Sequence, residues 1–110
     1  MNSVHQHSIS MHDLREKLPH LSKGEIVLDV RTPEEFSEGH VPGAINIDHE
    51  EIANHLAQLK SYSAVYIHCR SGGRAKWTFD VLQSEGLKNL VCIGNTGMKD
   101  WIEAGYPVEK

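Results

Sequence analysis

The 110-residue sequence has little of what several protein classes require. It has only two cysteines, Cys69 and Cys92, whose separation excludes a CxxC redox motif and argues against a structural disulfide. Lysine and arginine form no run, and 11 basic residues against 15 acidic ones leave a net charge of −4, which argues against a nucleic-acid groove. No apolar stretch approaches the roughly 18 residues of a membrane span. We therefore expect neither a nucleic acid nor a membrane as a partner.

The N-terminal segment and the histidines carry no targeting or metal-binding pattern. The first ten residues are polar and lack the apolar core of a signal peptide, so we expect a cytoplasmic protein with a flexible tail at residues 1–7. Eight histidines are many for this length, yet none has the HExxH or Cys/His spacing of a zinc site. The sequence therefore predicts no metal, and we expect surface imidazoles with one or two buried ones.

Length and patterning predict one α/β domain over residues 1–110. A chain of this size with 39% hydrophobic residues can bury a single core. Short apolar runs alternate with segments of helical pattern, which is typical of a parallel sheet with helices on both faces. We expect five strands, of which the first is a weak edge strand, at residues 8–11, 25–30, 44–47, 64–69 and 90–93.

Helical segments fill the intervals between these strands. The strongest, residues 73–85, places Ala75, Phe79 and Leu82 on one side and meets Gly86 as a stop signal. A short helix should begin after Thr32, because a proline and two acids follow this N-cap residue. Further helices are expected at residues 12–18, 50–59 and 98–104.

The turn Cys69-Arg70-Ser71-Gly72-Gly73-Arg74, between a predicted strand and a predicted helix, is the most informative segment. Its two arginines bring positive charge close to the cysteine, and the helix that follows adds its positive end. The glycine pair allows successive N–H groups to curl inward around an anion. We therefore take Cys69 as the candidate nucleophile and its neighbours as candidate substrate-binding residues, namely Arg70, Ser71, Gly72, Gly73 and Arg74.

Two residues that could compete for a catalytic role are better explained by structure. Cys92 lies in an apolar run without a charged neighbour and is predicted to pack in the core. His68 adjoins Cys69, but alternate side chains of a strand point to opposite faces, so its ring should point away from the sulfur. No Asp or Glu lies within the loop, and the chemistry therefore requires a ready-made anion rather than a proton shuttle.

The length of the loop separates two chemistries. Cys-type phosphatases have five residues between the cysteine and the arginine, which makes a ring of N–H groups that fits a phosphoryl group. Here only four residues separate Cys69 from Arg74, and Ala75 stands where a phosphatase would have its arginine. The loop is therefore one residue too short for that match.

This shorter loop closely resembles that of the rhodanese family of sulfurtransferases, in which four residues separate Cys from Arg. The likeness extends upstream to residues 28–36 (LDVRTPEEF) and 38–47 (EGHVPGAINI), and downstream to residues 86–91, 97–101 and 104–108. It covers roughly residues 8–108 and implies the single-domain rhodanese-like fold, a five-stranded parallel sheet with helices on both faces. Departures are few: Ala75 replaces a frequent serine, and Thr96 replaces a frequent glycine.

The resemblance implies a reaction and its partners. Cys69 would take a sulfane sulfur from a donor such as thiosulfate, hold it as a persulfide, and pass it to cyanide or to a thiol acceptor, either a small thiol or a thioredoxin-like protein. Arg70 and Arg74 would attract the dianionic donor, which favours thiosulfate over mercaptopyruvate. No metal or organic cofactor is required. Asp29 and Arg31 match family positions at which we expect them to tie loops together.

Two alternatives to this enzyme remain open at this point. The domain could be a binding or regulatory module that only carries a persulfide to a dedicated partner. Less favoured is a Cys-type phosphatase or arsenate reductase, suggested by the His68-Cys69 pair and Arg74.

Overall fold

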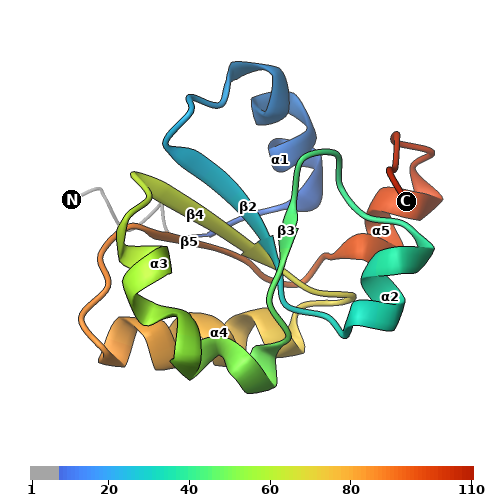
Figure 1. Ribbon diagram of the computed structural model, residues 1–110. Coiled ribbons are helices and arrows are strands. Elements are labelled where there is room, and N and C mark those ends of the chain that lie inside the picture. Colours follow the sequence, from blue (N-terminus) through green and yellow to red (C-terminus); the bar gives the residue numbers. More distant parts are fainter. Residues whose placement is uncertain (1–7) are drawn as a thin grey trace.

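A five-stranded parallel sheet forms the centre of the computed structural model, which describes residues 8–110, so the tail expected at residues 1–7 lies outside the described residues (Figure 1). The strand order is β1-β5-β4-β2-β3, and every neighbouring pair is parallel. The bounds are β1 Ser8–Ile9, β2 Glu25–Asp29, β3 Ile45–Asn46, β4 Ala64–His68 and β5 Leu90–Ile93. The predicted α/β class with five parallel strands is confirmed.

Helices cover both faces of this sheet. Their bounds are α1 Met11–Lys17, α2 Pro33–Glu38, α3 Leu56–Lys60, α4 Gly73–Ser84 and α5 Met98–Glu103, with 3₁₀-helices at η2 Leu18–His20 and η3 His49–His55. Figure 1 shows α3 and α4 on one side of the sheet and α1 on the other. None of the described helices has the length and apolar character that crossing a membrane requires.

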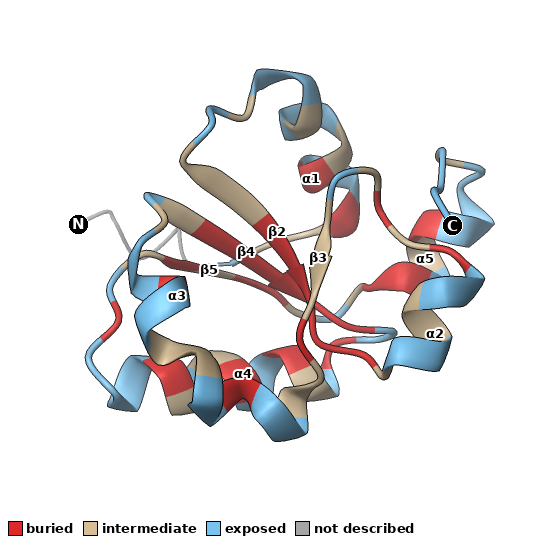
Figure 2. Ribbon diagram, viewed as in Figure 1, coloured by how far each residue is buried: buried red, intermediate tan, exposed pale blue. Residues whose placement is uncertain are grey.

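Strand alternation divides the core into two layers. Leu28 of β2 and Ile67 of β4 are paired in register and pack toward α3 and α4, with Leu82 among their neighbours. The preceding pair, Val27 and Tyr66, points to the other face of the sheet and packs in the second layer with residues of α1 and α5. Toward their carboxyl ends both central strands are buried on both faces, where Figure 2 colours them red, and this explains their continuous apolar sequences.

Two predicted elements differ from the structure for local reasons. The edge strand expected at residues 8–11 ends at Ile9, because Ser10 becomes the N-cap of α1 and its side chain forms a capping box with Asp13. The helix expected at residues 50–59 is a 3₁₀-helix as far as His55 and an α-helix only afterwards. Ile52 is the single buried residue of η3, so packing offers little to hold a regular α-helix there.

The sheet topology brings the candidate loop to the carboxyl edge of the central strand. β4 lies between β2 and β5, and the chain leaves it at Cys69 and enters α4 at Gly73. The loops that follow β2 and β5 emerge at the same edge, because all three strands run in the same direction. Ligands bind at this edge of open parallel sheets, so the position suits a functional site.

Candidate active site

The sulfur of Cys69 is held by backbone N–H groups. Cys69 directly follows β4 and is 1% exposed. Its Sγ accepts a hydrogen bond from the N–H of Gly72 at 3.1 Å and one from the N–H of Ala75, in the first turn of α4, at 3.3 Å. These donors stabilise negative charge on the sulfur or on an atom bonded to it.

Gly72 allows the loop to turn back toward the sulfur. Its φ of +120° lies in a region that residues with a side chain rarely adopt. An added Cβ would also meet the backbone nitrogen of Asn95, in the loop after β5, at 2.8 Å. A glycine is therefore required here by both the backbone conformation and the close approach of the neighbouring loop.

The carbonyl side of the loop is anchored to α5. The N–H of Met98 donates to the Cys69 carbonyl at 2.8 Å, and the N–H of Lys99 donates to the Arg70 carbonyl at 3.1 Å. Gly97, just before α5, packs so closely against these two carbonyl groups that a Cβ would overlap them. The start of α5 thus fixes the backbone that presents the cysteine.

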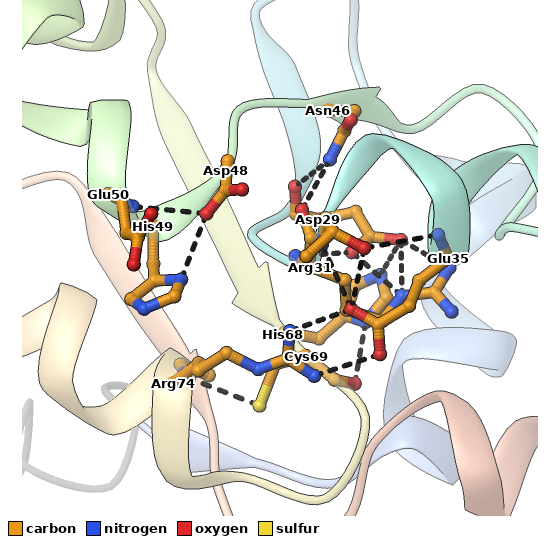
Figure 3. Close-up of polar contacts among 12 residues, drawn as sticks. Asp29, Arg31, Glu35, Asn46, Asp48, His49, Glu50, His68, Cys69 and Arg74 are labelled. Carbon is orange, nitrogen blue, oxygen red and sulfur yellow. Dashed lines mark hydrogen bonds and ion pairs between the residues drawn. The ribbon is translucent and has the colours of Figure 1, made fainter.

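Arg74 is paired with a carboxylate of the chain itself. Its guanidinium donates to Glu35 in α2 through two bonds, Nη1 to Oε1 at 2.7 Å and Nη2 to Oε2 at 3.0 Å (Figure 3). The hydrogen bond from Arg74 lowers the pKa of the Glu35 carboxyl to about 2. The sequence predicts Arg74 for an anionic ligand, whereas the structure shows it neutralised by Glu35.

Glu35 is a site residue that the sequence analysis did not identify. Its Oε1 also accepts the N–H of Thr32 at 2.9 Å, which makes it part of the capping box of α2. The sequence signal was an acid three residues after Thr32, which marks a helix start. Nothing in the spacing connects it to Arg74, which lies 39 residues away.

The remaining loop residues are accessible. Arg70, Ser71 and Gly73 are exposed. The Arg70 guanidinium forms no hydrogen bond or ion pair with any of residues 8–110, and an added Cβ on Gly73 would meet nothing within 4 Å. Arg70 is therefore a free cation of the loop, in contrast to Arg74.

His68 lies behind the loop and not beside the sulfur. Its ring is fully buried, and burial lowers its pKa. Nδ1 donates to the carbonyl of Cys69 at 3.2 Å, and Nε2 is 3.8 Å from Oδ2 of Asp29. Since its ring is bonded to the backbone of the loop and lies in the core, His68 supports the loop, and it forms no hydrogen bond with Sγ.

Asp29 and Arg31 form a buried ion pair at the end of β2. Arg31 Nη2 donates to Asp29 Oδ2 at 2.7 Å and to the carbonyl of Gly39, at the end of α2, at 2.9 Å. Asn46 donates to the carbonyls of both Asp29 and Arg31. These contacts tie the loop after β2 to α2 and β3, which is the role expected for the pair.

Cys92 is a core residue of β5. It is 5% exposed, and burial raises the pKa of its thiol to about 11. It pairs in register with Ile67, two residues before Cys69. Both cysteines are free. Within the described part of the chain, no group of three or more His, Cys, Asp or Glu residues could hold a metal ion.

Comparisons of the sequence with known proteins point to one family. The profile of the rhodanese-like domain matches residues 10–104. Thiosulfate sulfurtransferase 16, chloroplastic, from Arabidopsis thaliana is 35% identical over 107 residues, covering 81% of this chain and 83% of that protein. A putative sulfur carrier protein, YrkF of Bacillus subtilis, is 32% identical over 75 residues; the match covers 68% of this chain but only 40% of that protein.

Solved structures share the fold. A rhodanese-related protein from Thermoplasma volcanium has a TM-score of 0.78 at 34% identity, covering 93% of this chain and 96% of that one. A protein from Rhodopseudomonas palustris described as a possible tyrosine phosphatase has a TM-score of 0.82 at 19% identity, covering 97% and 87%. At that identity the second likeness concerns the fold alone.

Gly97→Ala should distort the loop, because its Cβ would overlap the carbonyl groups of Cys69 and Arg70. We expect a loss of about 2 kcal/mol or more in the free energy of unfolding, measured by chemical denaturation. Gly94→Ala is the matched control, since its Cβ would meet nothing within 4 Å and its φ is not positive. Equal stabilities of the two variants would contradict this account of the α5 contact.

Glu35→Gln should lower stability in a pH-dependent way. Because the pKa of Glu35 falls from 4.5 to about 2 on folding, its contribution is fully present above pH 4.5 and is lost as the pH falls through 2. We expect the wild type to be more stable by about 1 kcal/mol at pH 7, since partial exposure screens the pair. Denaturation at several pH values should show this gap closing between pH 4.5 and 2. A gap of constant size would contradict the prediction.

Proposed function

Because this chain belongs to the rhodanese-like domain family, we propose that it is a sulfurtransferase that carries a sulfane sulfur on Cys69 as a persulfide. The observation that carries this proposal is the pair of N–H donors on Sγ, from Gly72 and Ala75. Both donors are backbone groups, and no basic side chain of residues 8–110 donates a hydrogen bond to Sγ. Such an arrangement suits a nucleophile that attacks as a thiolate and a product that remains an anion.

In the first step, the Cys69 thiolate attacks the outer sulfur of thiosulfate. A bond forms between Sγ and that sulfur, the bond from the outer sulfur to the sulfonate group breaks, and its electron pair leaves with sulfite. One thiolate and one thiosulfate dianion thus become one persulfide anion and one sulfite dianion, so charge is conserved. The N–H groups of Gly72 and Ala75 lie at Sγ, on which the negative charge begins, and would be next to the outer sulfur, on which it ends.

In the second step, an acceptor attacks the outer sulfur of the persulfide. Cyanide takes it as thiocyanate, and the electron pair of the S–S bond returns to Sγ as the thiolate. A cellular thiol, on a small molecule or a thioredoxin-like protein, would take it as a new persulfide. The two half-reactions predict ping-pong kinetics. A reducing compartment such as the cytoplasm would keep Cys69 in the free state that this cycle needs.

A second candidate function is that of a persulfide carrier for a dedicated partner. It is favoured by the similarity to a protein described as a putative sulfur carrier. Carrier and enzyme share the persulfide on Cys69 and differ only in whether small acceptors are turned over. Phosphatase or arsenate reductase chemistry is not proposed, because the four-residue spacing from Cys69 to Arg74 gives a smaller ring of N–H groups than a phosphoryl group requires.

Cys69→Ser should abolish thiocyanate formation from thiosulfate and cyanide, because the oxygen of serine cannot form a persulfide. Cys92→Ser is the matched control and should retain most of the activity, since its thiol lies in the core and burial raises its pKa. Thiocyanate release is followed colorimetrically. Unchanged turnover in the Cys69 variant would overturn the proposed function.

Mass spectrometry of the thiosulfate-treated protein separates the two candidates. A gain of about 32 Da, one sulfur atom, at Cys69 is expected of both. Repeated turnover with cyanide or small thiols is expected only of the enzyme. An adduct without turnover would favour the carrier.

Arg70→Ala should raise the KM for thiosulfate by about threefold to tenfold and weaken its dependence on salt, because an unpaired exposed cation attracts a dianion mainly at low ionic strength. Lys88→Ala removes one exposed cation just before β5, at the opposite edge of the sheet, and serves as the control. Steady-state kinetics at low and high salt provide the measurement. An unaltered KM would remove Arg70 from donor binding.

A further inference from the structure

The loop around Cys69 carries less uncompensated positive charge than its two arginines suggest. Of the two loop arginines, Arg74 is bonded to both oxygens of Glu35, and Arg70 has no ionic partner within residues 8–110. The loop therefore carries one uncompensated cation in place of two. A dianionic donor meets less attraction than the sequence Cys-Arg-Ser-Gly-Gly-Arg predicts.

The ion pair lies close enough to the sulfur to influence it. Arg74 is in the first turn of α4, where the N–H of the next residue donates to Sγ. The bond to Glu35 raises the pKa of the Arg74 guanidinium most, and the charge of Cys69 raises it further. Figure 3 shows the Arg74 side chain extending from α4 past Cys69 toward Glu35. The Arg74 guanidinium thus lies near the reacting sulfur, and the Glu35 carboxylate lies beyond it.

Glu35 cannot easily turn away from this position. Its Oε1 also accepts the N–H of Thr32 at 2.9 Å and the Thr32 hydroxyl at 3.2 Å. Moving the carboxylate away would therefore remove the half of the α2 capping box that the Glu35 side chain supplies. Both side chains of the ion pair are only 28% exposed, so water screens the pair incompletely.

We propose that Glu35 determines which sulfane-sulfur donors the protein accepts, by disfavouring the thiosulfate dianion relative to monoanionic donors such as organic persulfides and thiosulfonates. The inference rests on the proposed sulfur transfer at Cys69 and names its donor class. If Arg74 keeps its bonds to Glu35, the carboxylate already offsets its positive charge. Arg74 then attracts the second negative charge of a dianionic donor only weakly. If Arg74 turns to bind the donor, the Glu35 carboxylate is left without its cation and lies near a dianion, which repels it. The carboxylate opposes the additional charge in both arrangements.

The chemistry at sulfur is the same for both classes of donor. With a thiosulfonate, Sγ bonds to the outer sulfur, the bond from that sulfur to the sulfonyl group breaks, and the electron pair leaves with a sulfinate monoanion. With an organic persulfide anion, the same attack releases a thiolate. Each reaction conserves charge and leaves the persulfide on Cys69, so donors can be compared by charge with the transferred atom held constant.

The test compares thiosulfate with benzenethiosulfonate, a monoanion that offers the same type of sulfur, with cyanide as the common acceptor. Glu35→Gln should raise kcat/KM for thiosulfate relative to benzenethiosulfonate by about tenfold, the size expected of one unit charge several ångströms from a partly exposed site. Gln retains a carbonyl oxygen for the N–H of Thr32. The relative gain should shrink at high salt.

Matched variants separate charge from packing. Glu34→Gln removes the same charge from an exposed neighbour in α2 and should leave the donor ratio unchanged. Glu35→Asp keeps the charge and should stay near the wild-type ratio. Glu35→Ala removes the charge without the hydrogen bonds of Gln and should shift the ratio in the same direction, so the result does not depend on one variant.

The outcomes distinguish this inference from the proposed function. Turnover of both donors through Cys69, with a donor ratio that Glu35→Gln and Glu35→Ala leave unchanged, would overturn the role of Glu35 and leave sulfur transfer intact. Absence of Cys69-dependent transfer from either donor would overturn both. An equal shift in the Glu34→Gln variant would assign the effect to net charge and would also overturn the inference.

Discussion

The site depends on one constraint: the chain must end a buried parallel strand and begin a helix within four residues while keeping the Cys69 sulfur within reach of two N–H groups. Gly72 makes this turn possible through its positive φ, and α4 supplies the second donor from its first turn. The rest of the fold maintains that geometry. β2 and β5 hold β4 on both sides, and α5 binds the carbonyl groups of the loop.

Charge around the sulfur is distributed by elements that are distant in the sequence. Arg31 is satisfied by Asp29, and Arg74 by Glu35, so two of the cations at this edge of the sheet stabilise the architecture. Arg70 remains unpaired within residues 8–110 and is exposed. Negative charge on the sulfur is consequently stabilised mainly by backbone dipoles, which cost no reorganisation during a reaction. In the proposed sulfur transfer, the charges around the loop influence which anionic donors approach.

Local sequence patterns are sufficient to locate the buried strands and the capped helix ends. The apolar runs of β2 and β4 and the signals Thr32-Pro33 and Gly86 locate strands and helix ends to within about one residue, because buried strands and capped helices need those residue types. The segment at residues 50–59 was less predictable. Its helical pattern is regular, but only Ile52 of η3 meets the core, and the amount of packing decides between a 3₁₀-helix and an α-helix.

The α/β fold, the candidate cysteine and the length of its loop could all be predicted from the sequence, because each of these follows from residues that are neighbours along the chain. It could not determine the partner of Arg74. Glu35 reaches Arg74 only because the parallel sheet brings the loop after β2 and the loop after β4 to the same edge. A capping carboxylate and a loop arginine, each explained locally, become an ion pair through the tertiary structure, and this pair reduces the uncompensated positive charge of the Cys69 loop.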